Sequence, residues 1–382
     1  MQLGCGITGL VCAEHVVKNA RVDELVLADA RTDSAEKLIA RLKNDKLSKA
    51  KVDATDPDSV KKVLKGCDLL VSSIPSELNM KVFSQVVASG SDYLDFSVAH
   101  EVIDDFEKYS KKCKNAGITA ITGMGADPGV SDVFARYAAN KLDSCYEAHV
   151  RDGDNGSAEG SEFFTLWSPL DMMEECTIPA AVFRNGKMTF LPPLNKKEVY
   201  KFPSPIGPLP VYNTTHEETY LIPKFIKGIK NADFKIAIDD NFVKTSNMLR
   251  KMGMHSLKPL DVKGTKVRPL DVVVTLMPRP VDLIGKVKGS AGIVVEVLGR
   301  KNGKKAMARV WTTLSHEKAY KMSKSNATGY LVGAGGAIGA EMLISGKIRS
   351  KGLYTGELLP AEEYVSRLPA KGLLVKESLS YL

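Results

Sequence analysis

The residues that most constrain the fold stand at the start of the sequence, where Gly4-Cys5-Gly6-Ile7-Thr8-Gly9 opens an apolar helical pattern. In this G-x-G-x-x-G spacing the first glycine permits a tight turn, the second lets backbone N–H groups approach a pyrophosphate, and the third allows close packing of helix on strand. The helix start would present unpaired N–H groups and a positive dipole end to the phosphates. The pattern predicts a bound dinucleotide, contacted by Gly4, Gly6, Ile7, Thr8 and Gly9.

A second predicted strand, residues 24–29, ends in Asp29, about 20 residues after the last of these glycines. A carboxylate there can accept hydrogen bonds from the adenosine ribose hydroxyls and repels a 2′-phosphate, so Asp29 favours NAD as the cofactor. Arg31 would pair with that phosphate if Asp29 turned away, which leaves NADP possible. The alternative is a glycine-rich turn in an α/β domain that binds no nucleotide.

Strand and helix patterns alternate over residues 1–125, which predicts an α/β fold with six short strands in a doubly wound parallel (Rossmann) sheet. One of these strands is expected at residues 51–54. The first strand is a stub, because only Met1-Gln2-Leu3 precede the glycines; a strand of ordinary length would need a start upstream of Met1.

Ligands bind such sheets at the carboxyl ends of the strands. At that edge Asp53 would lie near the adenine. An equally good interpretation is that Asp53 is only an acidic residue of the turn before Asp56-Pro57. Ser73, Ile74 and Pro75 leave the strand that faces the middle of the cofactor and are expected to contact it. A loop that merely leaves a buried strand would have the same sequence.

The sequence changes in character at about residue 128, where proline clusters and hairpin signals begin. Asn185-Gly186 between two apolar runs is typical of a type I′ turn, and a second hairpin is predicted over residues 293–311. With helices over 129–141 and 240–253, these strands predict a second, α+β domain with a mostly antiparallel sheet. We expect this domain to bind the substrate and to form a dimer.

Glycines at a similar spacing recur in residues 333–339. No strand ending in an acid follows where ribose binding would need one. The small residues therefore predict a helix packed closely against another surface, rather than a second nucleotide site.

The composition excludes several classes of protein. The net charge of +8 comes from lysines scattered over 382 residues, with no dense basic stripe, so we expect no nucleic-acid partner. The six cysteines show no paired spacing, which predicts reduced thiols, no metal site and a cytoplasmic location. No apolar stretch approaches the length of a membrane span, so we expect no membrane partner.

A second motif, Gly125-Ala126-Asp127-Pro128-Gly129, follows the last strand of the first domain. Locally it predicts a helix start with Asp127 as the N-cap and Pro128 at the first helical position. Because the loop leaves the sheet edge where substrate must meet nicotinamide, Asp127 is also a candidate catalytic residue. The alternative is that Asp127 only caps the helix.

Other titratable residues are weaker candidates. His216 lies beside Glu217 and Glu218 and would titrate in the useful range, although such a pair is more often structural. His100, shortly after Ser97, could reach the pocket. Candidate cations for an anionic group of the substrate are Lys235, Lys244 and Arg250, although a solvated surface position explains each of them better.

The chain resembles the saccharopine dehydrogenase family essentially from end to end. The residues that carry the resemblance are Gly4 to Gly9, Val52-Asp53-Ala54, Tyr93 to Ser97, Gly125 to Gly129, Ala327-Thr328-Gly329 and the tail Ile344 to Tyr354. The Asp-Pro-Gly loop and the Gly-Lys-Ile … Lys-Gly tail are the more specific parts. Members of this family include saccharopine reductases, L-lysine 6-dehydrogenases and carboxynorspermidine-type enzymes.

The resemblance implies a Rossmann domain at residues 1–127, a substrate-binding and dimerisation domain at 128–326 and a return segment at 327–382, usually in a homodimer. The helix at 328–345 would fold back onto the Rossmann domain. In saccharopine reductases the residues matching Ser97 and Asp127 line the substrate pocket, which makes Pro128 and Gly129 expected neighbours of the substrate.

The resemblance also implies hydride transfer between NAD(P) and a carbon of an amino acid's C–N bond. An amino-acid substrate needs a cation for its carboxylate and an acid for its ammonium group, and Asp127 is the candidate for the ammonium partner and for proton transfer. The expected function is a saccharopine dehydrogenase-like oxidoreductase acting on a lysine-derived secondary amine. One alternative is deamination of free L-lysine at its ε-carbon, although enzymes of that kind tend to lack the aspartate before Pro-Gly. Another is a catalytically inactive NAD(H) sensor, which the intact Asp127 loop disfavours.

Overall fold

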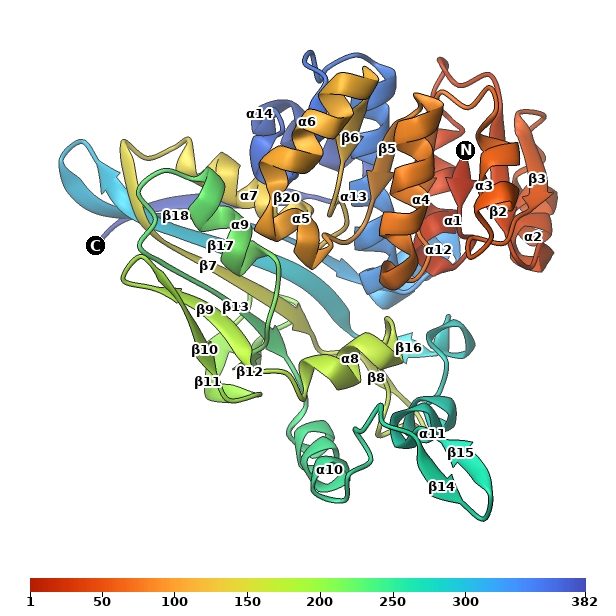
Figure 1. The fold of residues 1–382 in the computed structure, drawn as a ribbon. Helices are drawn as coiled ribbons and strands as arrows, with labels where there is room; N and C mark the ends of the chain where they lie inside the picture. Colours follow the sequence, from red (N-terminus) through yellow and green to blue (C-terminus); the bar gives the residue numbers. More distant parts are fainter.

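The computed structural model describes residues 1–382, apart from the side chain of Lys196. Its first sheet is parallel and seven-stranded, in the order β19-β6-β5-β4-β1-β2-β3 (Figure 1). The strands are β1 (Gln2–Leu3), β2 (Leu25–Asp29), β3 (Leu47–Lys51), β4 (Leu69–Ser72), β5 (Asp92–Asp95), β6 (Thr119–Ile121) and β19 (Gly352–Tyr354). The helices between them are α1 (Ile7–Val16), α2 (Asp33–Leu42), α3 (Pro57–Leu64), α4 (Ser76–Ser89), α5 (His100–Asp104) and α6 (Phe106–Ala116). The predicted doubly wound sheet is confirmed, with a seventh strand from the far end of the chain.

The third strand differs from its prediction. β3 spans Leu47–Lys51, whereas residues 51–54 were expected to form it. β3 is an edge strand on which only Leu47 is fully buried, so its hydrophobic signal is weak and the buried Val52 just beyond it is misleading. Asp53 therefore lies in the turn after the strand, where its Oδ1 accepts hydrogen bonds from the Thr55 backbone N–H (2.8 Å) and hydroxyl (2.6 Å).

The second sheet has nine strands and is mostly antiparallel, in the order β10-β9-β13-β7-β17-β18-β20, with β11 and β12 attached through β13. The strands are β7 (Ser144–Asp154), β9 (Ala180–Arg184), β10 (Lys187–Leu191), β11 (Asn195–Lys201), β12 (Pro208–Asn213), β13 (Asn231–Ala237), β17 (Ser290–Lys301), β18 (Lys304–Ser315) and β20 (Val375–Tyr381). β9–β10 and β17–β18 confirm both predicted hairpins; Asn185 and Gly186 have the positive φ values (49° and 78°) of a type I′ turn.

Two helices cover one face of this sheet and lie between it and the first domain (Figure 1). α7 (Val130–Ala139) packs on β17 and β18, and α9 (Glu218–Phe225) packs on β13 and β9. The remaining elements of the second half are β8 (Ser157–Ala158), α8 (Pro169–Glu175), α10 (Asp240–Lys251), β14 (Leu260–Val262), β15 (Thr265–Val267), α11 (Pro269–Leu276), η1 (Pro280–Leu283), β16 (Val287–Lys288) and α12 (His316–Ser323).

The glycine-rich helix α13 (Ala327–Ile344) lies against α1 and the first sheet. A Cβ on Gly333 would stand 2.5 Å from the Thr8 carbonyl oxygen, and one on Gly336 would stand 2.1 Å from the Phe96 ring. The prediction of close packing is confirmed. By length and composition α13 could cross a membrane, so the expectation that no apolar stretch reaches that length is wrong; 72% of it is buried inside the protein, which accounts for its apolar residues.

The segment after α13 joins both sheets. β19 pairs with β6 in the first sheet, and β20 pairs with β18 in the second. Between them lie η2 (Gly356–Leu358), α14 (Ala361–Arg367) and η3 (Leu368–Lys371). The Tyr364 hydroxyl donates to the Gly335 carbonyl (2.9 Å), and Arg136 of α7 donates to the Glu357 carbonyl (2.7 Å). The segment after α13 thus holds the two halves together around the loop after β6.

Candidate active site

A hollow at the carboxyl ends of β1, β2, β3 and β4 brings together most of the predicted cofactor residues. Those that line it are Gly4, Gly6, Asp29, Asp53, Ser73, Ile74 and Pro75. Gly4 has a φ of +91°, and a Cβ on it would stand 2.6 Å from the Ser73 carbonyl oxygen. A Cβ on Gly6 would meet nothing within 4 Å, so it would project into the open space before α1, whose N-terminus has no side-chain cap. These features fit a pyrophosphate held by the backbone N–H groups of α1.

Two backbone N–H groups hold the carboxylate of Asp29, one on each oxygen. Its Oδ2 accepts from the Cys5 N–H (2.6 Å) and its Oδ1 from the Arg31 N–H (2.9 Å). Its charge is therefore compensated, while each oxygen keeps a lone pair for a ribose hydroxyl. The Arg31 side chain is exposed beside the hollow and does not line it.

A larger cleft continues from this hollow to the second domain. It runs past Ile7 and Thr8 to Ser97 and reaches Trp167 and Thr328 on the far side. His100, by contrast, is exposed at the first residue of α5 and does not line the cleft.

The loop after β6 supplies Asp127 without using it as a helix cap. α7 begins at Val130, and the Gly129 N–H donates to Asp132 Oδ2 (2.8 Å), so the expected capping by Asp127 and Pro128 is wrong. Gly129 has a φ of +129°, and a Cβ on it would stand 2.5 Å from the Gly125 backbone nitrogen. This tight turn shifts the helix start two residues onward and leaves the Asp127 carboxyl free for the site.

The carboxyl group of Asp127 lies close enough to that of Asp152, at the end of β7, for each to act on the pKa of the other. Burial and the charge of Asp152 raise the pKa of Asp127 well above its ordinary value. Burial and the charge of Asp154 raise the pKa of Asp152 to about 7. Because two adjacent carboxylates resist ionising together, the pair shares a proton at neutral pH and presents one negative charge.

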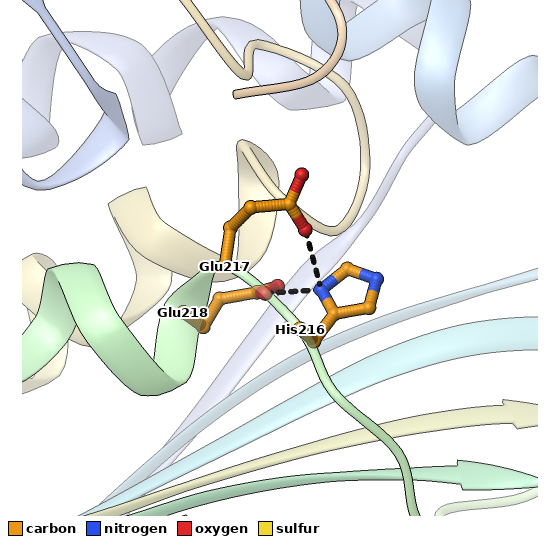
Figure 2. Close-up of side chains that lie close together, drawn as sticks. All are labelled: His216, Glu217 and Glu218. Carbon is orange, nitrogen blue, oxygen red and sulfur yellow. Dashed lines mark hydrogen bonds and ion pairs between the residues drawn. The ribbon is translucent and has the colours of Figure 1, made fainter. Parts of the chain in front are cut away.

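His216 stands in the same cluster, just before α9. Its ring stacks on Phe234 (3.9 Å between centroids, 14° between planes). Figure 2 shows Glu217 and Glu218 converging on one ring nitrogen, Nδ1, while the other nitrogen points away from both. Burial lowers the pKa of His216, but the charge of Glu218 and its hydrogen bond outweigh burial and raise it well above its ordinary value.

Glu217 joins this cluster to the first domain. Its Oε1 accepts from the Val98 N–H (3.3 Å), one residue after Ser97 in the cleft. Three atoms of His216, Glu217 and Glu218 lie within 4.8 Å of one another, close enough for a metal ion. Because the two glutamates raise the pKa of His216, we interpret the trio as an imidazolium paired with carboxylates.

A side pocket that Asp152 lines lies next to the cleft. Both hollows are lined by Leu166, Trp167 and Thr328, so the two are adjacent. The pocket's acidic residues are Asp152, Asp154, Glu162 and Asp239, and its aromatic residues are Phe164, Trp167 and Phe242. None of these pocket residues was predicted from the sequence. The sequence Asp152-Gly153-Asp154 at the end of a strand was the available signal, since both acids face the same side.

The candidate carboxylate clamps lie away from this pocket. Lys235 pairs with Arg151 in the register of β13 and β7, so it points to the sheet face opposite Asp152, where it meets Glu198 (2.5 Å). Lys244 and Arg250 are exposed on α10.

Comparisons with known proteins agree with this architecture. The family model described as the saccharopine dehydrogenase NADP binding domain matches residues 1–121, and the saccharopine dehydrogenase C-terminal domain matches residues 125–373. Carboxynorspermidine synthase of Vibrio alginolyticus is 30% identical over 98% of this chain and 95% of that protein. Carboxyaminopropylagmatine dehydrogenase of Synechocystis is 26% identical over 98% and 96%.

Among solved structures, the apo form of saccharopine dehydrogenase (L-Glu forming) from Saccharomyces cerevisiae has the same fold, with a TM-score of 0.76 and 16% identity over 99% of this chain and 98% of that one. The family expected from the sequence motifs is therefore confirmed. The chain belongs to the saccharopine dehydrogenase family and is an NAD(P)-binding oxidoreductase of that family.

Proposed function

We propose that this protein uses NAD(P)H to join an amine of a di- or polyamine to the aldehyde group of an amino acid, giving a carboxylated polyamine, and that it can run the reverse oxidation. Two relatives carry names of this kind, carboxynorspermidine synthase and carboxyaminopropylagmatine dehydrogenase. The observation that carries the proposal is the acidic side pocket. Saccharopine, the substrate favoured by sequence motifs alone, has more carboxylates than amines, whereas a carboxylated polyamine has more amines.

The chemistry of the side pocket suits a chain of ammonium groups. Four of its lining residues are acids, and none is lysine or arginine, although the whole chain carries a net charge of +8. Carboxylates attract ammonium groups, and the faces of Trp167 and the two phenylalanines add cation–π attraction. A tricarboxylate such as saccharopine would be repelled at the same place.

Within this proposal the Asp127–Asp152 pair binds and prepares the reacting amine. An ammonium group must lose a proton before its nitrogen can attack an aldehyde, and the pair, with its single charge, has a place for that proton. Ser97 lines the cleft and would border the substrate on the cofactor side, whereas Pro128 and Gly129 are buried and line neither hollow. When bound in the cleft, the reduced nicotinamide supplies the hydride that completes the new C–N bond.

The cofactor residues have separate tasks in this proposal. The N–H groups at the start of α1 would hold the pyrophosphate, Asp29 would take the ribose hydroxyls, and Asp53, Ser73, Ile74 and Pro75 would border the adenosine half. Asp29 favours NAD(H), while the exposed Arg31 is available to pair with the 2′-phosphate of NADP(H). We also propose a homodimer, which sedimentation of the purified protein would measure.

A turnover screen tests the proposal. Oxidation of NADH and of NADPH is followed with diamines of increasing length, each with and without an amino-acid semialdehyde; saccharopine and L-lysine are assayed with NAD and NADP in the opposite direction. Turnover that requires both amine and aldehyde supports the proposal. Turnover of saccharopine alone, or of lysine alone, contradicts it in favour of those enzymes. Cofactor binding with no turnover of any amine would favour an NAD(H) sensor.

A further inference from the structure

The ring nitrogen of His216 that points away from the two glutamates is Nε2, and neither glutamate contacts it (Figure 2). Four features hold the ring in one orientation: the stack on Phe234, the contacts of Nδ1 with Glu218 and Glu217, and the hydrogen bond from the Ser131 hydroxyl to Glu218 Oε1 (2.7 Å). Only 1% of the Glu218 side chain is exposed, whereas 12% of the His216 side chain is. The carboxylate is therefore sealed behind a ring that is still accessible.

We propose that His216 is a catalytic residue that exchanges a proton through Nε2 at the reacting C–O bond, and that Glu218 is a positioning residue that holds the proton on Nδ1 and aims Nε2 into the cluster; this inference rests on the function proposed above. The roles follow from chemistry: an imidazole whose Nδ1–H is held by a carboxylate can give and take a proton only at its other nitrogen.

The surroundings of His216 match that task. The charged and titratable groups that act on it or on which it acts are Glu217 and Glu218 of α9, Glu175 of α8, Asp127 of the loop after β6, and Asp152 of β7. All are acids, and the charges of Glu218 and Glu217 in particular stabilise the imidazolium form and make His216 an acid. Ser131 lies in α7, four residues after Asp127, so one short segment orients both the amine-binding aspartate and, through Glu218, the histidine.

The step can be written with its atoms balanced. Attack of the neutral amine on the aldehyde gives a carbinolamine, after the ammonium proton has passed to the Asp127–Asp152 pair. The C–O bond then breaks, its electron pair stays on oxygen, and Nε2 of His216 delivers the proton that makes water. The nitrogen lone pair forms the C=N bond, whose carbon accepts the hydride. In the oxidative direction neutral His216 takes the proton of the water that adds to C=N.

The test compares variants of His216 and Glu218 with a histidine outside the site. His255 follows α10 and does not line the pocket or the cleft, so His255→Gln is the matched control. Each variant is measured for kcat and KM in the amine–aldehyde reaction, for NAD(P)H binding by fluorescence, and for its unfolding transition. We expect His216→Gln to lose about 100-fold or more in kcat, with cofactor binding unchanged and His255→Gln like the parent protein.

Glu218→Gln distinguishes positioning from simple structural support. Its amide can keep the Ser131 contact but removes the charge that stabilises the imidazolium, so the basic limb of the kcat–pH profile should move to lower pH, while Glu218→Asp restores part of the original profile. If His216→Gln fails to fold, the shift of the kcat–pH profile in Glu218→Gln tests the proposal by itself. An unmoved profile overturns the proposal.

Three further results also overturn it. One is a kcat for His216→Gln within about threefold of the parent protein, and another is loss of NAD(P)H binding in that variant, which would mark a structural role. The third is a kcat that falls on treatment with EDTA and returns with a divalent metal, because then the trio of His216, Glu217 and Glu218 holds a metal ion. If the parent protein turns over no amine–aldehyde pair, the proposed function fails, and this inference fails with it.

Discussion

Replacing Asp152 by asparagine should make the protein more stable and less active. The pKa of Asp152 rises from 3.8 to about 7, mainly through burial and then through the charge of Asp154. A shift of about three units corresponds to about 4 kcal/mol of free energy of unfolding. Losing the favourable interaction of the Asp152 carboxyl with Asp127 gives back about 1 kcal/mol. The net gain expected at basic pH is therefore about 3 kcal/mol.

The gain in stability expected for Asp152→Asn depends on pH. Since the pKa of Asp152 is higher in the folded protein than in the unfolded chain, the folded form keeps a proton that the unfolded chain has already lost. The contribution to stability is present in full below about pH 4 and is lost as the pH rises through about 7. Asp152→Asn should thus raise the urea midpoint at about pH 8 and leave it nearly unchanged at about pH 4.

The activity of Asp152→Asn should fall. A charge-assisted hydrogen bond from a substrate ammonium is worth about 1.5–3 kcal/mol, so kcat/KM for the amine should fall about 10- to 100-fold. Asp58→Asn removes the same charge from an exposed carboxylate (90% exposed) of α3 and should change neither property. A variant that is less stable than the parent protein at both pH values, or fully active, would refute the reasoning.

Three more substitutions test other parts of the structure. Gly6→Val fills the open space before α1 and should weaken NAD(P)H binding at least tenfold in a fluorescence titration, with the unfolding transition unchanged. Gly336→Ala drives a methyl group into the Phe96 ring and should cost about 1–3 kcal/mol of stability by denaturant unfolding. Arg31→Ala should weaken binding of NADP(H) and leave that of NAD(H) unchanged; equal loss of both would exclude a contact with the 2′-phosphate.

The fold of the first domain could be predicted from the sequence because its motifs meet local requirements of the backbone. Gly4 to Gly9 and the acid at the end of β2 predicted the parallel sheet and its ligand edge, because each residue type answers a backbone requirement at that place. Asn185-Gly186 predicted its hairpin for the same reason. The glycines of α13 predicted close packing, although nothing in the sequence could name α1 and Phe96 as the partners.

The residues that surround the substrate could not be predicted in this way. Asp127, Asp152 and His216 come from a loop, a strand end and the residue before a helix, and only tertiary packing brings these distant parts of the sequence together. The helix start after Asp127 was misplaced because the left-handed turn at Gly129 transfers the capping role to Asp132. The domain boundaries at residues 127 and 326 stay predictions, as does the cytoplasmic location.

The central claim is that hydride passes to the carbon joined to a polyamine nitrogen beside the Asp127–Asp152 pair. Isotope transfer measures it most directly: NAD(P)H carrying deuterium at the reactive carbon is incubated with a diamine and an amino-acid semialdehyde, and the product is analysed by mass spectrometry. The account predicts deuterium on the carbon bonded to the new secondary nitrogen, and far less product from Asp152→Asn. A protein that binds the labelled cofactor yet transfers no deuterium to any amine-derived product would contradict it.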